Sequence, residues 1–252
     1  MSITFLSHCH TEYSEVWPVY FDYLFKNSKT FKKVVCVNNK NEMEEFFKTR
    51  DYIYDQLIEY DETIPFAQRM IYILELIQSE YVIYYSDNYI LMSFDENKIM
   101  SVVDWLHKNQ LSSVQFHLRK NDNDLINITD DIHVYQIKDL EYPFSFLPSI
   151  WDRIALLNMY KLVPNSSYRS FEIDVMSYIH NFAKVFRLKD IGQVKEIGWD
   201  SDMEPWFTYL IIIHYRNWCD ENLFKNDYFK NEYINIMKKY NINTNKLGVR
   251  KS

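Results

Sequence analysis

The sequence has 252 residues and a formal net charge of −7, and 47% of its residues are hydrophobic and 17% aromatic. This composition can fill a folded core, which excludes a disordered chain. Lys and Arg are scattered under a negative net charge, which argues against a nucleic-acid partner. Three glycines cannot build a glycine-rich phosphate loop, so any nucleotide must be held in another way.

The cysteines and apolar runs bear on the compartment. Cys9, Cys36 and Cys219 are far apart and form no CxxC pair, which favours a reducing environment. The N-terminus lacks a basic start, and the later apolar run YLIIIHY is far shorter than the ~18 residues of a membrane span. We therefore expect a cytoplasmic protein without a membrane span.

The first ninety residues predict alternating strands and helices. Apolar runs predict strands at residues 3–6, 31–37, 52–60 and from 81 onward, and helical spacing predicts helices from residue 15, from 43 and over 65–78. Ser14 is a candidate cap for the first helix. This order indicates an α/β fold with a mostly parallel central sheet flanked by helices. Ligands bind at the carboxyl ends of such strands, which points to the loops 7–14, 38–41, 61–64 and 86–88.

The rest of the chain continues the pattern as one domain. It predicts helices over 96–109, 149–162 and 171–182 and from 229 onward, and strands over 113–118 and 134–137. The acidic tract 119–131 lacks the glycine and terminal glutamate of a calcium-binding EF-hand loop. A solvated hairpin is the better interpretation of that tract.

The stretch YVIYYSDNYILM, residues 81–92, ends a buried strand on Ser86, Asp87 and Asn88. A carboxylate at the rim of a parallel sheet, in a chain without phosphate-binding glycines, indicates a metal that bridges the protein to a diphosphate. The alternative is a simple turn after the strand.

Two stretches resemble GT-A glycosyltransferases. YDETIPFAQRMIYILELIQSEYVIYYSDNYIL, residues 60–91, is similar to the helix and strand that lead to the acidic DxD-like motif of that family. PSIWDRIALL and the later SFEIDV resemble the acceptor-side helix and Phe-Glu pair of some bacterial and giant-virus members. The resemblance covers residues 3–175 and implies one GT-A-like domain. It implies a nucleotide-sugar-binding half at 1–92, an acceptor-side half at 93–225, and a C-terminal helix and tail at 226–252.

The resemblance implies transfer of a sugar from a nucleoside diphosphate sugar, with UDP as the expected nucleotide, to a hydroxyl of a glycan or glycoconjugate. Mn²⁺ or Mg²⁺ would be the cofactor, with Asp87 as its ligand and Ser86 and Asn88 as further donor contacts. A DxD-like motif offers two carboxylates and this one offers one, so a metal-independent enzyme remains open. So does an inactive glycan- or nucleotide-binding protein on the same fold. For a viral chain, the host cytoplasm or the virion is the expected location.

Glu172 is the candidate general base, with Asp174 as its neighbouring alternative, and an inverting transfer follows from that role. Both acids lie in the predicted first turn of a helix, where they also favour the helix dipole without any chemistry. His214 is a candidate further metal ligand, or else a partly buried histidine. Trp151 is a candidate platform for an acceptor sugar ring, or else a core residue.

The remaining donor-site candidates come from the edge loops. Arg69 is placed to reach the nucleotide or diphosphate, and Asp61 with Glu62 to bind the uracil or ribose, although helix capping would also explain acids here. His8 and His10 follow the first strand, where GT-A proteins hold the nucleobase. A zinc pair of these histidines, as in a metal hydrolase of another α/β family, would need a third ligand.

Overall fold

The computed structural model describes residues 1–119, 125–137, 144–189, 201–204, 207–214, 217–224, 226–242 and 249–250. The chain forms two compact units that each combine separate stretches of sequence. Unit 1 consists of Met1–Thr11, Phe31–Ser86 and Ile99–Lys189, and unit 2 of Glu12–Thr30, Asp87–Lys98 and Asp190–Ser252. The functional halves expected from the sequence, at 1–92 and 93–225, with the tail at 226–252, stay a prediction.

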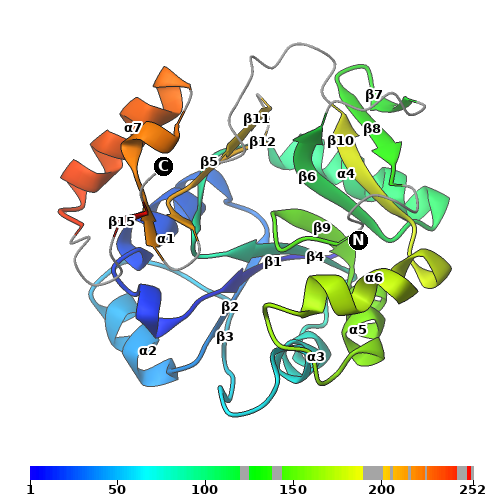
Figure 1. The fold of residues 1–252 in the computed structure, drawn as a ribbon, viewed down its shortest axis with the longest axis horizontal. Helices are drawn as coiled ribbons and strands as arrows, with labels where there is room; N and C mark the ends of the chain where they lie inside the picture. Colours follow the sequence, from blue (N-terminus) through cyan, green and yellow to red (C-terminus); the bar gives the residue numbers. More distant parts are fainter. Residues whose placement is uncertain are drawn as a thin grey trace. The chain divides into compact units, whose positions relative to one another are not determined.

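Unit 1 is built on a nine-stranded sheet in the order β3-β2-β1-β4-β9-β6-β10-β8-β7 (Figure 1). Only β9 and β8 run against the other strands of this sheet. The strands are β1 Ile3–His8, β2 Lys32–Val37, β3 Gln56–Glu59, β4 Tyr81–Ser86, β6 Ser113–Arg119, β7 Ile126–Thr129, β8 Ile132–Gln136, β9 Ser149–Asp152 and β10 Val185–Lys189.

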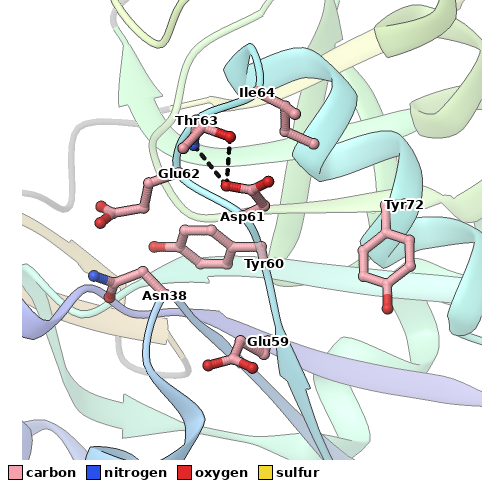
Figure 2. A pocket seen from close by; sticks show the side chains of 8 residues that line it. All are labelled: Asn38, Glu59, Tyr60, Asp61, Glu62, Thr63, Ile64 and Tyr72. Atoms are coloured by element: carbon pink, nitrogen blue, oxygen red, sulfur yellow. Dashed lines mark hydrogen bonds between the residues drawn. The ribbon is translucent and has the colours of Figure 1, made fainter.

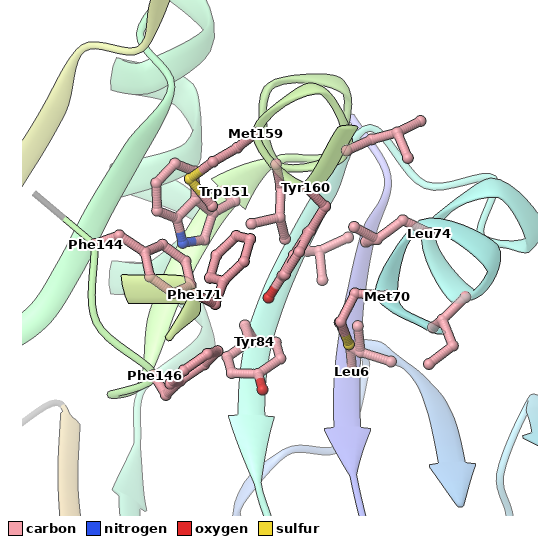
Figure 3. Packing of buried hydrophobic residues seen from close by; sticks show 14 of the residues in the cluster. Leu6, Met70, Leu74, Tyr84, Phe144, Phe146, Trp151, Met159, Tyr160 and Phe171 are labelled. Atoms are coloured by element: carbon pink, nitrogen blue, oxygen red, sulfur yellow. The ribbon is translucent and has the colours of Figure 1, made fainter. Parts of the chain in front are cut away.

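Helices flank both faces of this sheet. The helices that contribute to unit 1 are α2 Lys40–Lys48, α3 Phe66–Leu76, α4 Glu96–Asn109, α5 Arg153–Leu162 and α6 Phe171–Phe182. On one face, α3, α5 and α6 cover an apolar cluster that includes Leu6, Tyr84 and Trp151 from the strands (Figure 3). On the other face, Trp105 of α4 packs edge-on against Phe186 of β10, with ring centroids 5.0 Å apart. The predicted α/β class with a mostly parallel sheet flanked by helices is confirmed.

Two strands of the central sheet were not predicted from the sequence: β10 has no predicted counterpart, and β9 replaces the start of a predicted helix. The run that begins after Pro148 predicts a helix from Ser149, but residues 149–152 form β9, which pairs antiparallel with β4 and β6. Helix α5 begins only at Arg153, and Asp152 caps it by accepting a hydrogen bond of 2.7 Å from the Ala155 N–H. A strand of four residues, here Ser-Ile-Trp-Asp, is too short to show a periodicity that separates strand from helix.

Most other elements match their predictions within a few residues. The polar tract forms part of a hairpin, since β7 and β8 pair antiparallel around a turn at Asp130 and Asp131. Its residues 120–124, which contain two further aspartates, lie outside the described residues. The predicted cap at Ser14 is wrong, because α1 begins at Trp17 and its N-cap residue, Val16, makes no side-chain cap.

Unit 2 holds α1 Trp17–Asn27, the strand β5 Tyr89–Phe94 and two small sheets. The first sheet has the order β11-β12-β5, with β11 Ser201–Glu204 and β12 Phe207–Ile211. The second joins β13 Ile213–His214, β14 Asn217–Cys219 and β15 Val249–Arg250. The helix predicted for the tail is α7 Asp227–Lys239, and the short 3-10 turns are η1 Thr11–Tyr13 and η2 Glu221–Leu223. No helix within the described part of the chain is both long and apolar enough to cross a membrane.

Phe171→Ala should destabilise unit 1 strongly, because this fully buried ring stacks on Tyr160 with centroids 4.3 Å apart. We expect a loss of about 3 to 5 kcal/mol in the free energy of unfolding, measured by urea denaturation. Ile173→Ala on the same helix is the control, because Ile173 is 63% exposed and should change stability by less than about 0.5 kcal/mol. Equal losses for the two variants would contradict the packing described for α6.

Candidate functional site

The strand order places a topological switch point at the carboxyl edge of the sheet in unit 1. Strands β2 and β3 lie on one side of β1 and β4 lies on the other, so the connections leave β1 and β4 in opposite directions. In open α/β sheets ligands bind at such a switch point, outside the carboxyl ends of the strands. Here these ends are His8 and Ser86, whose Cα atoms are partners in the parallel register.

An open pocket of about 600 Å³ lies at this edge, beside the ends of β2 and β3. Its lining is rich in carboxylates and tyrosines (Figure 2). The lining residues are Asn38, Glu59, Tyr60, Asp61, Glu62, Thr63, Ile64 and Tyr72. The volume lies within the range of small-molecule sites, which is about 300 to 1,000 Å³.

Arg69 organises the loop that forms one wall of this pocket. Its Nε donates to the Ile64 carbonyl at 2.9 Å, and its Nη2 donates to the Glu62 carbonyl at 2.5 Å. The guanidinium also lies 5.7 Å from the centroid of the Tyr60 ring, within cation–π range. Arg69 therefore lies at the carboxyl edge of the sheet, as expected, and there its Nε and Nη2 bind carbonyls of the loop.

Two carboxylates of the loop are kept ionised by hydrogen bonds. Asp61 Oδ1 accepts from the Thr63 hydroxyl at 2.7 Å and the Thr63 N–H at 2.8 Å, and these bonds lower the pKa of Asp61. Burial acts to raise the pKa of Glu62, but hydrogen bonds from Asn38 and His10 outweigh it, and the pKa is lowered. The His10 bond to Glu62 ties the loop after β1 to the loop after β3.

His8 is enclosed by aromatic rings. It stacks on Tyr60 with centroids 5.3 Å apart and planes 9° apart, and it meets the edge of Phe66 at 5.8 Å. Burial, followed by the charges of His10 and Arg69, lowers the pKa of His8 to about 3. The ring is therefore neutral near pH 7, and its Nε2 is buried without a hydrogen-bond partner among the described residues.

A row of aromatic rings leads from His8 to the candidate base. Phe66 contacts Tyr168 and Phe146, with centroids 5.2 and 5.3 Å away, and Tyr168 stacks on Phe146 at 4.3 Å. The Phe146 N–H donates to Glu172 Oε1 at 2.8 Å. Unit 1 therefore brings the pocket, His8 and Glu172 into one connected arrangement.

The two acids at the start of α6 have opposite environments. Burial raises the pKa of Glu172, against the lowering effect of the Phe146 hydrogen bond. Asp174 is exposed and accepts from the Ser166 hydroxyl at 2.6 Å, and hydrogen bonds from Ser166 and Ser170 lower its pKa. Of the two, Glu172 has the environment that favours proton exchange, while Asp174 stabilises the turn before the helix.

Trp151 is a core residue, which corrects its expected role as a sugar platform. Its ring is fully buried in the apolar cluster, and its Nε1 donates to the Ser149 hydroxyl at 2.9 Å (Figure 3). A buried ring has no face to offer a ligand. Tyr168 is an aromatic residue that the sequence prediction missed: it is 46% exposed and stacks on Phe146, whose N–H donates to Glu172. Its only signal in the sequence is its place just before α6.

The residues expected to bind a metal do not form a site for one. Asp87 is 2% exposed, and its Oδ2 accepts a hydrogen bond of 3.2 Å from Trp17 Nε1. The Asn88 side-chain amide donates to the Ile213 carbonyl at 3.4 Å, and the His214 side chain lies outside what the structure describes. Across the described ranges, no group of three or more His, Cys, Asp or Glu residues could hold a metal ion. This donor set does not fit a resident divalent cation, and His8 and His10 belong to no three-ligand group among the residues that the structure describes.

Comparisons with known proteins give only distant likenesses. No protein-family model and no curated protein matches the chain. The bifunctional IspDF from Campylobacter jejuni aligns with a TM-score of 0.46 and 15% identity, over 78% of this chain and 52% of that chain. The S. aureus TarS 1-349 structure in complex with UDP-GlcNAc aligns with a TM-score of 0.44 and 10% identity, over 78% and 60%.

The mannosyltransferase PcManGT from Pyrobaculum calidifontis, in complex with GDP-Man and Mn²⁺, aligns with a TM-score of 0.48 and 10% identity, over 75% of this chain and 56% of that chain. This chain thus spans 52 to 60% of the three matched chains. Because all three TM-scores are below 0.5, these likenesses carry no argument about activity here.

His8 should make the protein sensitive to acid. The unfolded chain binds a proton at His8 near pH 6.5, whereas the folded chain does so only near pH 3, so stability falls as the pH drops through this window. His8→Phe keeps the ring stack but cannot bind a proton. We expect it to reduce the dependence of the free energy of unfolding on pH by up to about 1.4 kcal/mol per pH unit. Urea unfolding of both proteins at pH 7 and pH 4.5 measures it, and identical pH dependence would contradict a buried neutral His8.

Proposed function

We propose that the protein is a GT-A-like glycosyltransferase that binds a nucleoside diphosphate sugar at the carboxyl edge of unit 1. The observation that carries the proposal is the row of rings that connects the edge pocket, through His8 and Phe66, to the half-buried carboxyl of Glu172. This arrangement supplies a binding pocket beside the ends of β2 and β3, and a proton acceptor that is connected to it through His8 at the switch point of the sheet. The resemblance of the sequence to GT-A enzymes supports the same assignment.

The charge of the pocket supports an orientation for the donor. Glu59, Asp61 and Glu62 line it, and carboxylates accept hydrogen bonds from ribose hydroxyls and from the N–H groups of a base. The same carboxylates repel phosphate groups. The nucleoside therefore occupies the pocket, with Tyr72 as an aromatic contact for the base, and the diphosphate points away from it.

Glu172 would take the proton from the acceptor hydroxyl as that oxygen attacks the anomeric carbon and the nucleoside diphosphate leaves. Direct attack on the face opposite the leaving group inverts the anomeric configuration. Tyr168 offers a partly exposed ring that stacks on Phe146, the residue whose N–H donates to Glu172, and such rings stack on the apolar face of a sugar. We therefore propose Tyr168, in place of Trp151, as the platform for a glycan or glycoconjugate acceptor.

Mn²⁺ or Mg²⁺, when present in an enzyme of this kind, neutralises charge on the leaving diphosphate. The described residues do not fit such an ion, so the reaction proposed here includes no step at a metal. The burial of Asp87 also favours a second candidate function, which is a nucleotide- or glycan-binding protein that has lost catalysis.

Tyr72→Ala should weaken nucleoside binding without unfolding the protein, because Tyr72 lines the pocket and is about half exposed. Loss of a base contact of about 1 to 3 kcal/mol corresponds to a 5- to 150-fold higher Kd. Calorimetric titration with UDP, GDP, CDP and their sugar conjugates measures this effect. Tyr178→Ala is the control, since Tyr178 is equally exposed on α6 and does not line the pocket. Equal affinities for both variants and the parent would show that the nucleoside does not bind in this pocket.

Glu172→Gln should reduce transfer of the donor sugar to water or to an added acceptor by about 10²- to 10⁴-fold while the Kd for the donor is unchanged. Only the ionised carboxyl can accept a proton, so activity of the parent should rise with pH through a pKa above the ordinary glutamate value of 4.5. Asp174→Asn is the control and should keep the rate. Donor binding with no turnover in the parent itself would favour the inactive binding protein.

A further inference from the structure

Two carboxylates bracket β5 in unit 2, one just before it and one just after it. At the near end, Trp17 Nε1, in the first turn of α1, donates to Asp87 Oδ2 at 3.2 Å. At the far end, Glu96 accepts hydrogen bonds from the segment that directly follows α1. These come from the Lys29 N–H at 2.6 Å, the Thr30 N–H at 2.9 Å, the Thr30 hydroxyl at 2.6 Å and the Ser28 hydroxyl at 3.3 Å.

Between the two carboxylates, α1 lies along β5. Asn27, the last residue of α1, donates from Nδ2 to the Leu91 carbonyl in β5 at 2.7 Å. The helix and the strand are therefore fixed to each other at the start, near the end and beyond the end of the helix. Asp87 and Glu96 have the same structural task at opposite ends of one contact.

The contact between Asp87 and Trp17 is buried, which distinguishes it from a metal site that an ion can enter. Trp17 is 1% exposed and Asp87 is 2% exposed. A buried carboxylate is stable only with hydrogen-bond or charge partners, and the indole N–H is one such partner. A divalent cation at Asp87 would have to enter this buried contact and complete a shell of about six oxygen ligands. The neighbouring Asn88 amide instead donates to the Ile213 carbonyl at 3.4 Å.

We propose that Asp87 is an anchor for α1 and not a metal ligand, although it occupies the sequence position at which GT-A enzymes hold their cation. Its carboxylate positions the start of α1 against the residue pair that joins β4 to β5. Nucleotide binding therefore does not depend on the charge of Asp87, with or without a divalent ion. This last consequence rests on the proposed function, whereas the anchoring role does not.

Three variants test whether Asp87 anchors α1 or binds a metal ion. Asp87→Asn keeps an oxygen that accepts the indole hydrogen bond but loses the charge, Asp87→Ala loses both, and Trp17→Phe removes the donor. An anchor predicts that Asp87→Ala and Trp17→Phe each lower the Tm by about 4 to 10 °C, while Asp87→Asn lowers it by less than half as much. The double variant Asp87→Ala with Trp17→Phe should lose little more than either single variant. A fully additive double variant would overturn the anchor.

The ligand role is tested by binding rather than turnover. Mn²⁺ alone, followed by electron paramagnetic resonance, and UDP, followed by calorimetry in EDTA and in Mn²⁺, are titrated into the parent protein and Asp87→Asn. We expect Asp87→Asn to change neither the binding of Mn²⁺ nor the Kd for UDP by more than about twofold, a difference of 0.4 kcal/mol. A loss of tenfold or more in Mn²⁺ binding, or in Mn²⁺-dependent UDP binding, would overturn the proposal.

If the parent binds none of the nucleotides or sugar conjugates in either buffer, the proposed function fails, and the Tm comparison decides the anchor by itself. The two failures are therefore distinguishable.

Discussion

The parallel pairing of β1 with β4 is the constraint on which the candidate site depends. Because β2 and β3 continue on the other side of β1, the chain must cross over the sheet before it forms β4, and the connections diverge above His8 and Ser86. The pocket is formed by the loops after β2 and β3, and the ring row begins at the last residue of β1. Residues from three separate loops meet because the strands all end at one edge.

The sequence predicts the elements whose pattern is local. Helix α6 carries buried residues at Phe171, Val175 and Ile179, a spacing that identifies it without tertiary information. Strand β4 is a continuous apolar run because both of its faces are buried. The four residues of β9 become a strand only because β4 and β6, distant in sequence, leave an antiparallel place between them. No local pattern carries that information.

In the candidate site, too, some features follow from the local sequence and others from contacts between distant segments. The strand order brings His8, His10 and Asp61 to the expected edge, since residues after parallel strands share an edge. The partners of the two histidines are distant in sequence: His10 bonds to Glu62, and His8 stacks on Tyr60. The Trp151 ring turns into the core with β9. Tyr168 stacks on Phe146, which comes from a different loop. Residue type predicts what a side chain can do, and only packing determines whether a ligand can reach it.

Carboxylates of one chemical type acquire different roles from their surroundings. Hydrogen bonds from Thr63 keep Asp61 ionised at the exposed pocket, where a permanent acceptor suits ribose hydroxyls. Burial raises the pKa of Glu172, which makes that carboxyl the better proton acceptor. Asp87 is buried against an indole N–H and so takes part in packing. Burial and hydrogen bonding give these carboxylates different pKa values and different access to a ligand, and these differences assign their roles. A sequence motif alone cannot assign them.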